Sequence, residues 1–303
     1  MIRQLVISIL LFSCLINTTA SKAPIPNPNC PTMCRNVSIP FPFGIGEGCY
    51  VDEWFEVVCE NSTTSPPPKL KRFDLEVMRI DLYDGTLDVR YPITFWNCGG
   101  GKTPQENRSL EGSPFAFAQD KNKFIAVGCE GHATIISERD SIVADCSSVC
   151  ANDVSVDTRC NGVNWCRTSI PPNLQVFNAR FNITSSSDQN SETDCRYAFL
   201  GKETWFSQSV TNLSALLEMI DVPVVLNWGL DASKHEDVGT SVESFSRKSG
   251  KRKSTRTGYC NRSSDTSFSS LFPESGQLAC YCNGGFEGNP YLPGGCDGKA
   301  PLP

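Results

Sequence analysis

The chain has 303 residues, of which 39% are hydrophobic and 10% aromatic, enough to bury a substantial core in one large or two moderate domains. This composition excludes a disordered tail. The formal net charge of −6 makes the protein acidic overall, which disfavours nucleic acid as a partner.

Residues 1–20 have the features of a secretory signal peptide. Arg3 precedes an apolar run from Leu5 to Ile16, and Thr18 and Ala20 stand at the small-residue spacing that a signal peptidase accepts. The alternative is a membrane anchor, but the run has about 12 residues and a bilayer span needs roughly 20. No later stretch is long and apolar enough to span a membrane, so we expect a secreted, soluble mature chain without a transmembrane span.

The cysteine count indicates an oxidising compartment. Fifteen of the 16 cysteines remain once Cys14 leaves with the signal, and in an exported protein such cysteines form disulfides more often than metal or redox sites. Because fifteen is odd, one thiol lacks a partner within the chain. Six Asn-x-Ser/Thr sequons in the mature chain are potential glycosylation sites and predict surface positions for Asn36, Asn61, Asn107, Asn182, Asn212 and Asn261.

Strand signals dominate the first half of the chain. Apolar residues alternate on both sides of Asp84-Gly85 across residues 75–96, which predicts a β-hairpin with a tight turn. Pro92 cannot donate to a ladder, which predicts that the second strand lies at a sheet edge. A second strand pair is expected from Phe115 to Cys129, with Gln119 to Lys123 as its turn.

The second half predicts one helix, one buried strand and a small module. The helical spacing of Leu213, Leu216, Leu217 and Ile220 predicts a short amphipathic helix, and VPVVLNW at 222–228 predicts a buried strand. Residues 231–258 have linker composition, and four cysteines follow between Tyr259 and Cys296. The expected fold class is therefore mostly β and disulfide-rich, with small β-sheet domains, one short helix and a small C-terminal module.

Two distant segments resemble the extracellular region of plant wall-associated receptor kinases. CPTMCRNVSIPFPFGIGEGCY at 30–50 is similar to the start of their galacturonan-binding domain, and CYCNGGFEGNPYLPGGC at 280–296 is similar to their EGF-like end. The intervening VGC, DCSSVC, CRYAFL and VPVVLNW follow in the family's order. The resemblance implies a galacturonan-binding cysteine-rich β domain at 30–130, a cysteine-containing continuation at 131–230, a basic polar linker at 231–258 and a reduced EGF-like module at 259–297.

The sequence departs from the family pattern in two places. Family members carry two adjacent cysteines where this chain has Trp165-Cys166, so Trp165 resembles a replaced half-cystine whose partner is left unpaired. A disulfide between chains is the alternative. The EGF-like module has lost two of its six cysteines, and the EGF pattern implies that the remaining ones pair as Cys260–Cys280 and Cys282–Cys296.

Family members continue into a plasma-membrane span and a kinase, whereas this sequence stops at Pro303. A secreted ectodomain and a truncated receptor are both consistent with that.

Catalysis has little support in the sequence. Only His132 and His235 are present, and no G-x-S-x-G or H-E-x-x-H motif occurs. We expect no enzymatic activity, no cofactor and no metal site, with calcium entering only as a bridge to a bound polymer.

The resemblance implies that the protein binds acidic pectin, as homogalacturonan or oligogalacturonides, in the cell wall. A polymer of carboxylates requires guanidinium or ammonium groups, and the first domain offers six candidates: Lys69, Lys71, Arg72, Arg90, Lys102 and Arg108. For any one of them, a solvated surface charge is the alternative. The alternative function is a protein-interaction ectodomain or soluble decoy of a wall-associated receptor kinase, with other cell-wall or receptor proteins as partners. A third possibility is that the chain is a non-functional fragment.

Overall fold

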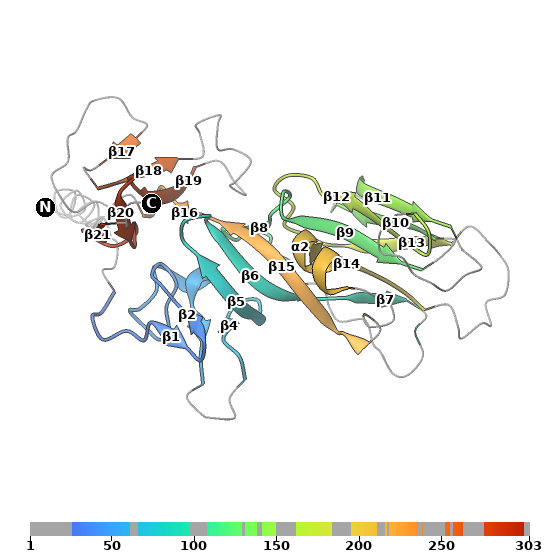
Figure 1. The fold of residues 1–303 in the computed structure, drawn as a ribbon, viewed down its shortest axis with the longest axis horizontal. Coiled ribbons are helices and arrows are strands. Elements are labelled where there is room, and N and C mark those ends of the chain that lie inside the picture. The colour runs from blue at the N-terminus through green and yellow to red at the C-terminus, as the bar shows by residue number, and fades with distance from the viewer. Residues whose placement is uncertain are drawn as a thin grey trace, which may run out of the picture.

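The computed structural model describes residues 26–60, 66–96, 98, 108–128, 131–137, 141–149, 162–183, 195–210, 216, 218–235, 238, 252–254, 257–262 and 276–299. Over these residues the expected fold class is confirmed, because the chain consists mainly of antiparallel strands in small sheets with one short helix, α2 (Figure 1). The helix spans Glu203–Ser209.

The central layer is a six-stranded antiparallel sheet in the order β3-β4-β5-β6-β15-β8. Its strands are β3 (Val57–Val58), β4 (Lys69–Leu70), β5 (Leu75–Asp81), β6 (Thr86–Pro92), β15 (Asp221–Trp228) and β8 (Phe115–Phe117). The predicted hairpin is confirmed as β5 and β6, and the predicted buried strand is confirmed as β15.

The prediction that Pro92 marks a sheet edge is wrong. The strand β6 lies between β5 and β15, and Pro92 is its last residue, opposite Asp221. A proline at a strand end disturbs little of the ladder, and the next amide, Ile93 N, already donates to Ile220 O at 2.9 Å.

A four-stranded sheet in the order β12-β9-β14-β7 lies beside the first. It contains β12 (Trp165–Ser169), β9 (Asn122–Val127), β14 (Arg196–Lys202) and β7 (Thr94–Trp96). The expected pairing of the strands within 115–129 is therefore wrong, because β8 and β9 belong to different sheets. The buried Asn122 side chain explains the separation, since it donates to Ala118 O and Val225 O and accepts from Val225 N, which ties the turn to β15.

A three-stranded sheet, β11-β10-β13, packs next to β12. Its strands are β10 (Gly131–Ile136), β11 (Ile142–Ser148) and β13 (Ala179–Ile183). Half of the predicted helix at 213–220 lies outside the described residues, which include 216 and 218–220. The helix α2 ends just before it, and Phe206 of α2 packs against Trp165 with ring centroids 5.1 Å apart.

The C-terminal module has a four-stranded sheet, β16-β19-β18-β17, and a two-stranded ribbon of β20 and β21. The bounds are β16 (Leu230–Asp231), β17 (Arg252–Ser254), β18 (Gly258–Arg262), β19 (Gln277–Cys282), β20 (Phe286–Gly288) and β21 (Cys296–Lys299). Gly288 has φ of 128°, and a Cβ there would overlap the Gly295 carbonyl oxygen, so the ribbon requires glycine in its Gly-Asn-Pro run.

The expected linker at 231–258 contains strands at both of its ends. Asp231 belongs to β16, and Arg252–Ser254 pair with β18 as β17. His235 and Val238 are buried. The residues between Val238 and β17 lie outside the described part of the chain.

The N-terminal segment contributes a small ribbon, β1 (Met33–Cys34) with β2 (Val37–Ser38), and a 3-10 turn, η1 (Glu53–Phe55). Gly44 stands between them, and a Cβ on it would overlap the carbonyl oxygen of Cys49, so the Pro-Phe-Gly run can only close with glycine here.

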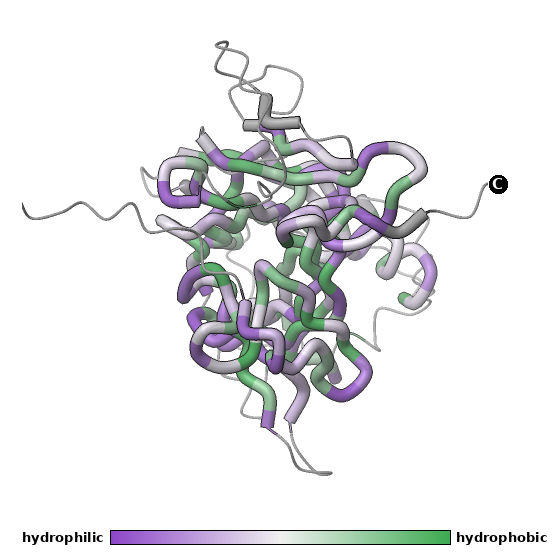
Figure 2. Tube along the Cα trace, turned by 90° about the vertical axis from the view of Figure 1, so that its left-hand side faces the viewer, coloured by the Kyte–Doolittle hydropathy of each residue, from purple (hydrophilic) through white to green (hydrophobic). Residues whose placement is uncertain are grey.

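The hydrophobic core joins these parts. Trp228 at the end of β15 contacts Phe43 at 5.2 Å, Phe55 at 5.8 Å and Tyr291 of the C-terminal module at 5.3 Å between ring centroids. Figure 2 shows the hydrophobic stretches along the inner strands and hydrophilic loops around them. The boundary expected at residue 130 does not separate two sheets, because β15 lies in the sheet of β5 and β6 while β9 pairs with β12 and β14.

Candidate functional site

Five of the six basic residues expected to bind carboxylates gather around the β4–β5 turn. Across β3, β4 and β5, Val57, Leu70 and Leu75 face the core, so their neighbours Lys69 and Glu76 face outward. The turn that follows β4 carries Lys71 and Arg72, β6 contributes Arg90, and Arg108 reaches in from the segment before β8. We call Lys69, Lys71, Arg72, Arg90 and Arg108 the basic edge. The sixth candidate, Lys102, lies outside the described residues.

Every residue of the basic edge pairs with a carboxylate. The nitrogen–oxygen distances are 2.7 Å for Lys69–Asp74, 2.8 Å for Lys71–Glu56, 2.9 Å for Arg72–Glu53, 3.1 Å for Arg90–Asp221, 3.6 Å for Arg90–Glu76 and 3.3 Å for Arg108–Asp74. Five cations therefore face five carboxylates, and the cluster carries no net formal charge.

The cations of these pairs are exposed and so open to exchange. The Lys71 side chain is 56% exposed, the most of the five. The hydrogen bond from Lys71 to Glu56 raises the pKa of Lys71, and the hydrogen bond from Lys69 lowers the pKa of Asp74, so both groups stay charged near neutral pH. Because water and salt screen exposed ion pairs, a carboxylate from a ligand can compete with the protein's own.

Buried groups beneath the basic edge hold its backbone. The Tyr91 hydroxyl donates to Arg108 O at 2.7 Å, and Arg108 Nη1 donates to Phe73 O at 2.9 Å. Tyr91 is fully buried, so this hydrogen bond anchors the Arg108 segment to the core.

Trp54 adds an aromatic ring to the basic edge. The guanidinium carbon of Arg72 lies 4.4 Å from the Trp54 ring centroid, and Trp54 stacks on Phe73 with centroids 5.8 Å apart. Asp52 caps η1 by accepting from Trp54 N at 2.9 Å, which fixes the ring's backbone. Selection by charge alone overlooks Trp54, and the signal available in the sequence is an aromatic residue flanked by acids in DEWFE.

Further cations of the structure lie outside the six predicted from the sequence. Arg79 on β5 pairs with Asp81 and its side chain is 60% exposed. Lys123 of β9 and Arg167 of β12 both lie 3.7 Å from Glu203 at the start of α2. These cations are likewise paired with carboxylates.

All twelve cysteines in the described residues form disulfides. The pairs are Cys30–Cys49, Cys34–Cys59, Cys98–Cys195, Cys146–Cys166, Cys260–Cys280 and Cys282–Cys296. The last two are the pairs that the EGF-like pattern implies. Cys129, Cys150 and Cys160 lie outside the described residues.

The potential glycosylation sites differ in their surroundings. Asn36 is exposed in the β1–β2 turn, and Asn182 lies in β13. The surface position expected for Asn261 is wrong, because this residue is 7% exposed within β18, between β17 and β19. Asn61, Asn107 and Asn212 fall outside the described residues.

Within the described ranges, no group of three or more His, Cys, Asp and Glu side chains is arranged to hold a metal ion. Over the same ranges, no helix has the length and apolar character needed to cross a bilayer.

Comparisons with family models match two separate segments of the chain. The family model described as wall-associated receptor kinase galacturonan-binding matches residues 30–91, which include β1 to β6 and all of the basic edge except Arg108. The family model described as wall-associated kinase matches residues 157–237, from before β12 to the end of β16. No solved structure matches the chain.

Curated relatives from Arabidopsis thaliana align along most of the chain. Wall-associated receptor kinase-like 3 is 32% identical over 97% of this chain and 42% of its own length, and wall-associated receptor kinase-like 4 is 33% identical over 88% and 36%. Wall-associated receptor kinase 1 is 30% identical over 89% and 34%. The chain thus spans less than half the length of these relatives. Together with the disulfide-rich β fold, these matches show that the chain belongs to the wall-associated receptor kinase family, in which it corresponds to the receptor ectodomain.

Proposed function

We propose that the protein binds acidic galacturonan at the basic edge, outside the cell and in the cell wall, without catalysis. The observation that carries the proposal is the placement of Arg72 on the Trp54 ring, together with the exposed Lys69, Lys71 and Arg90, within the segment similar to a galacturonan-binding domain. A secretory signal at residues 1–20 would deliver the chain to that compartment.

Binding would proceed by exchange of carboxylates. A galacturonate carboxylate takes the place of Glu53 on Arg72 or of Glu56 on Lys71, and the planar Arg72 guanidinium can donate two parallel hydrogen bonds to it. The sugar's C–H face can pack on the part of the Trp54 ring that remains accessible.

The charge balance of the basic edge predicts weak binding of a single residue. Each contact replaces an existing ion pair, so the gain per carboxylate is small. A polymer overcomes this limit because several contacts form within one molecule and the later ones are intramolecular. Affinity should therefore rise with the length of the oligomer and fall with added salt.

The experiment is titration of the secreted mature chain with de-esterified oligogalacturonides across a salt series, with and without a calcium chelator. We expect Lys71→Ala and Arg72→Ala each to weaken binding several-fold, and more so in long oligomers. Lys121→Ala is the matched control, because Lys121 pairs with Asp84 at the opposite end of the β5–β6 hairpin. Equal losses in all three variants, or salt-independent binding, would contradict the basic edge as the site. Loss on chelation alone would assign the contact to bridging calcium.

A further inference from the structure

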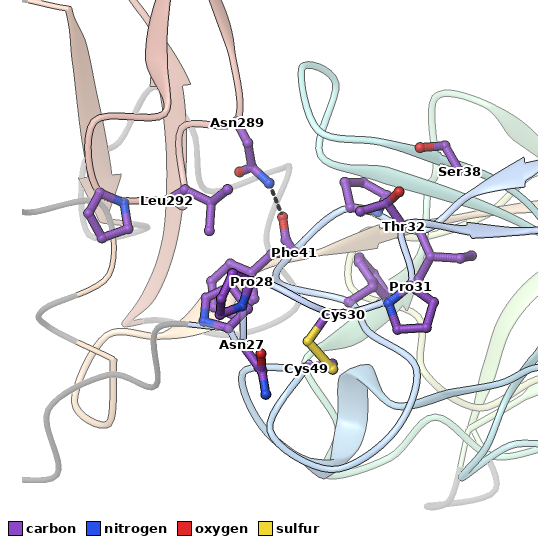
Figure 3. Close-up of a pocket in the computed structure, with 15 residues that line it drawn as sticks. Asn27, Pro28, Cys30, Pro31, Thr32, Ser38, Phe41, Cys49, Asn289 and Leu292 are labelled. Carbon is purple, nitrogen blue, oxygen red and sulfur yellow. Dashed lines mark hydrogen bonds between the residues drawn. A yellow bond between two sulfur atoms is a disulfide. The ribbon is translucent and has the colours of Figure 1, made fainter.

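A groove of about 540 Å³ lies between the N-terminal segment and the C-terminal module. Five prolines line it, and we call it the proline-lined groove: Pro26, Pro28, Pro31, Pro40 and Pro293. Figure 3 shows Asn289 and Leu292 on one side, Pro31, Thr32 and Ser38 on the other, and the Cys30–Cys49 disulfide below. The volume is within the range of about 300–1,000 Å³ that is usual for small-ligand sites.

One hydrogen bond joins the two walls, and a second orients the side chain that makes it. Asn289 Nδ2 donates to Phe41 O at 2.6 Å, and Asn289 Oδ1 accepts from Tyr291 N at 2.9 Å. Tyr291 is itself buried against Trp228. The wall from the C-terminal module is therefore fixed to the core that also supports the N-terminal wall.

The lining is uncharged. Among the described residues that form the groove there is no Lys, Arg, His, Asp or Glu, and the polar groups are the side chains of Asn27, Thr32, Ser38 and Asn289. A bare carboxylate would lose water here without gaining a cation, which is costly. The lining instead suits a neutral ligand with apolar faces for the proline rings and hydroxyl groups for Thr32 and Ser38.

Esterified pectin has this chemistry. A methyl ester removes the charge of a galacturonate residue, adds an apolar methyl group and leaves the sugar hydroxyls in place. Nine of the fifteen lining residues lie between Cys30 and Cys49, within the segment matched by the galacturonan-binding model. We propose that the proline-lined groove is a second subsite that binds methyl-esterified galacturonan residues. The proposal rests on the proposed function, because it assumes the same polymer.

The two subsites are joined through one stretch of backbone. Gly44, next to the groove residue Phe43, accepts from Val57 N at 2.9 Å and donates to Phe55 O at 3.2 Å. Phe55 and Val57 flank Glu56, which pairs with Lys71 of the basic edge, and they follow Trp54, which contacts Arg72. A partly esterified chain could therefore place its ester residues in the groove and its free carboxylates on the basic edge.

The test compares one oligogalacturonide in two forms, fully methyl-esterified and saponified, against the mature chain. We expect the esterified form to bind with little dependence on salt, and Thr32→Trp and Ser38→Trp, which add bulk at two exposed wall positions, each to weaken it at least tenfold. The same variants should bind the saponified form as the wild type does, while Lys71→Ala should show the reverse pattern. Thermal unfolding of each variant checks that it is folded.

A measurement on the unmodified chain tests this assignment without mutation. Hydroxyl-radical footprinting should show protection of Leu292 and Pro293 on one wall, and of Pro31 on the other, only with the esterified oligomer. Binding of the saponified form alone would overturn the groove proposal and leave the basic edge intact, whereas binding of neither form would remove both. Binding of the esterified form that survives both tryptophan substitutions would also overturn the groove proposal. Protection of the groove residues in the free protein would do the same, because another part of the chain would already occupy the groove.

Discussion

His235 Nε2 lies 3.0 Å from Asp52 Oδ2, although 183 residues separate the two side chains. His235 is almost fully buried, and its Nδ1 has no hydrogen-bond partner among the described residues. Asp52 uses its other oxygen to cap η1. The segment that follows β16 is thereby attached to the turn that carries Trp54 and Glu53, both of which contact Arg72 of the basic edge.

Replacing His235 by alanine should lower the free energy of unfolding by about 1–3 kcal/mol, because it removes the hydrogen bond to Asp52 and leaves a cavity. Urea denaturation of the mature chain measures this. Lys234→Ala is the control, because the adjacent Lys234 side chain is 71% exposed and its loss should change little. Equal stability of both variants would show that the His235 contact is unimportant.

The contact between Trp228 and Tyr291 predicts that the C-terminal module unfolds together with the central sheet. Tyr291 is 1% exposed, and its hydroxyl accepts from Cys280 N at 3.3 Å. Tyr291→Ala should lower the free energy of unfolding by about 3–5 kcal/mol, whereas Tyr83→Ala should have almost no effect because Tyr83 is 81% exposed. A single cooperative transition in the wild type is expected by calorimetry. Two separate transitions would contradict the shared core.

Local sequence patterns predicted the local structure well. The hairpin of β5 and β6 follows from alternation and an Asp-Gly turn, and the buried strand β15 from its apolar run. The pairing of strands distant in sequence could not be predicted, because an alternation of apolar and polar residues is compatible with many partner strands. The β8–β9 turn illustrates this, since a single buried side chain, Asn122, directs the two strands into different sheets.

The sequence predicted the cations of the candidate site but not their partners. Arg90 and Asp221 are 131 residues apart, and Arg108 and Asp74 are 34 apart, so their pairing depends on tertiary structure. The linker composition of residues 231–258 likewise hid His235, whose buried position depends on Asp52. Charge and composition identify residue types, whereas the ion-pair partner of a cation and the burial of a side chain depend on which residues the fold brings next to it.

Tyr91 makes the stability sensitive to alkali. Burial raises its pKa far above the usual value of about 10, so the unfolded state releases this proton first. Its contribution to stability is fully present below about pH 10 and is lost as the pH rises toward the folded pKa. Tyr91→Phe should lower the free energy of unfolding by about 1 kcal/mol at neutral pH, because the hydrogen bond to Arg108 O is lost. Above pH 10, the free energy of unfolding of this variant should fall by about 1.4 kcal/mol less per pH unit than that of the wild type. Denaturation at a series of alkaline pH values measures both effects, and an unchanged slope would contradict the assignment.

The odd number of cysteines in the mature chain predicts one alkylatable thiol. Twelve cysteines are already paired, so the thiol must come from Cys129, Cys150 or Cys160 if all three remain within one chain. Alkylation of the unfolded, unreduced protein followed by peptide mass spectrometry should label one of these three and none of the twelve. A disulfide-linked dimer on a non-reducing gel would instead show that the odd cysteine pairs between chains.

Restoring a cysteine at position 165 should abolish that labelling without improving stability. Trp165 is fully buried against Phe206, so Trp165→Cys leaves a large cavity that costs about 3–5 kcal/mol. A new disulfide would stabilise the protein by about 2–4 kcal/mol, which is similar to or smaller than the loss caused by the cavity. We therefore expect a variant that no longer reacts with the alkylating reagent and is no more stable than the wild type. Continued labelling of the same cysteine would show that position 165 does not replace the partner of that cysteine, because the two sulfur atoms would then lie too far apart to form a disulfide.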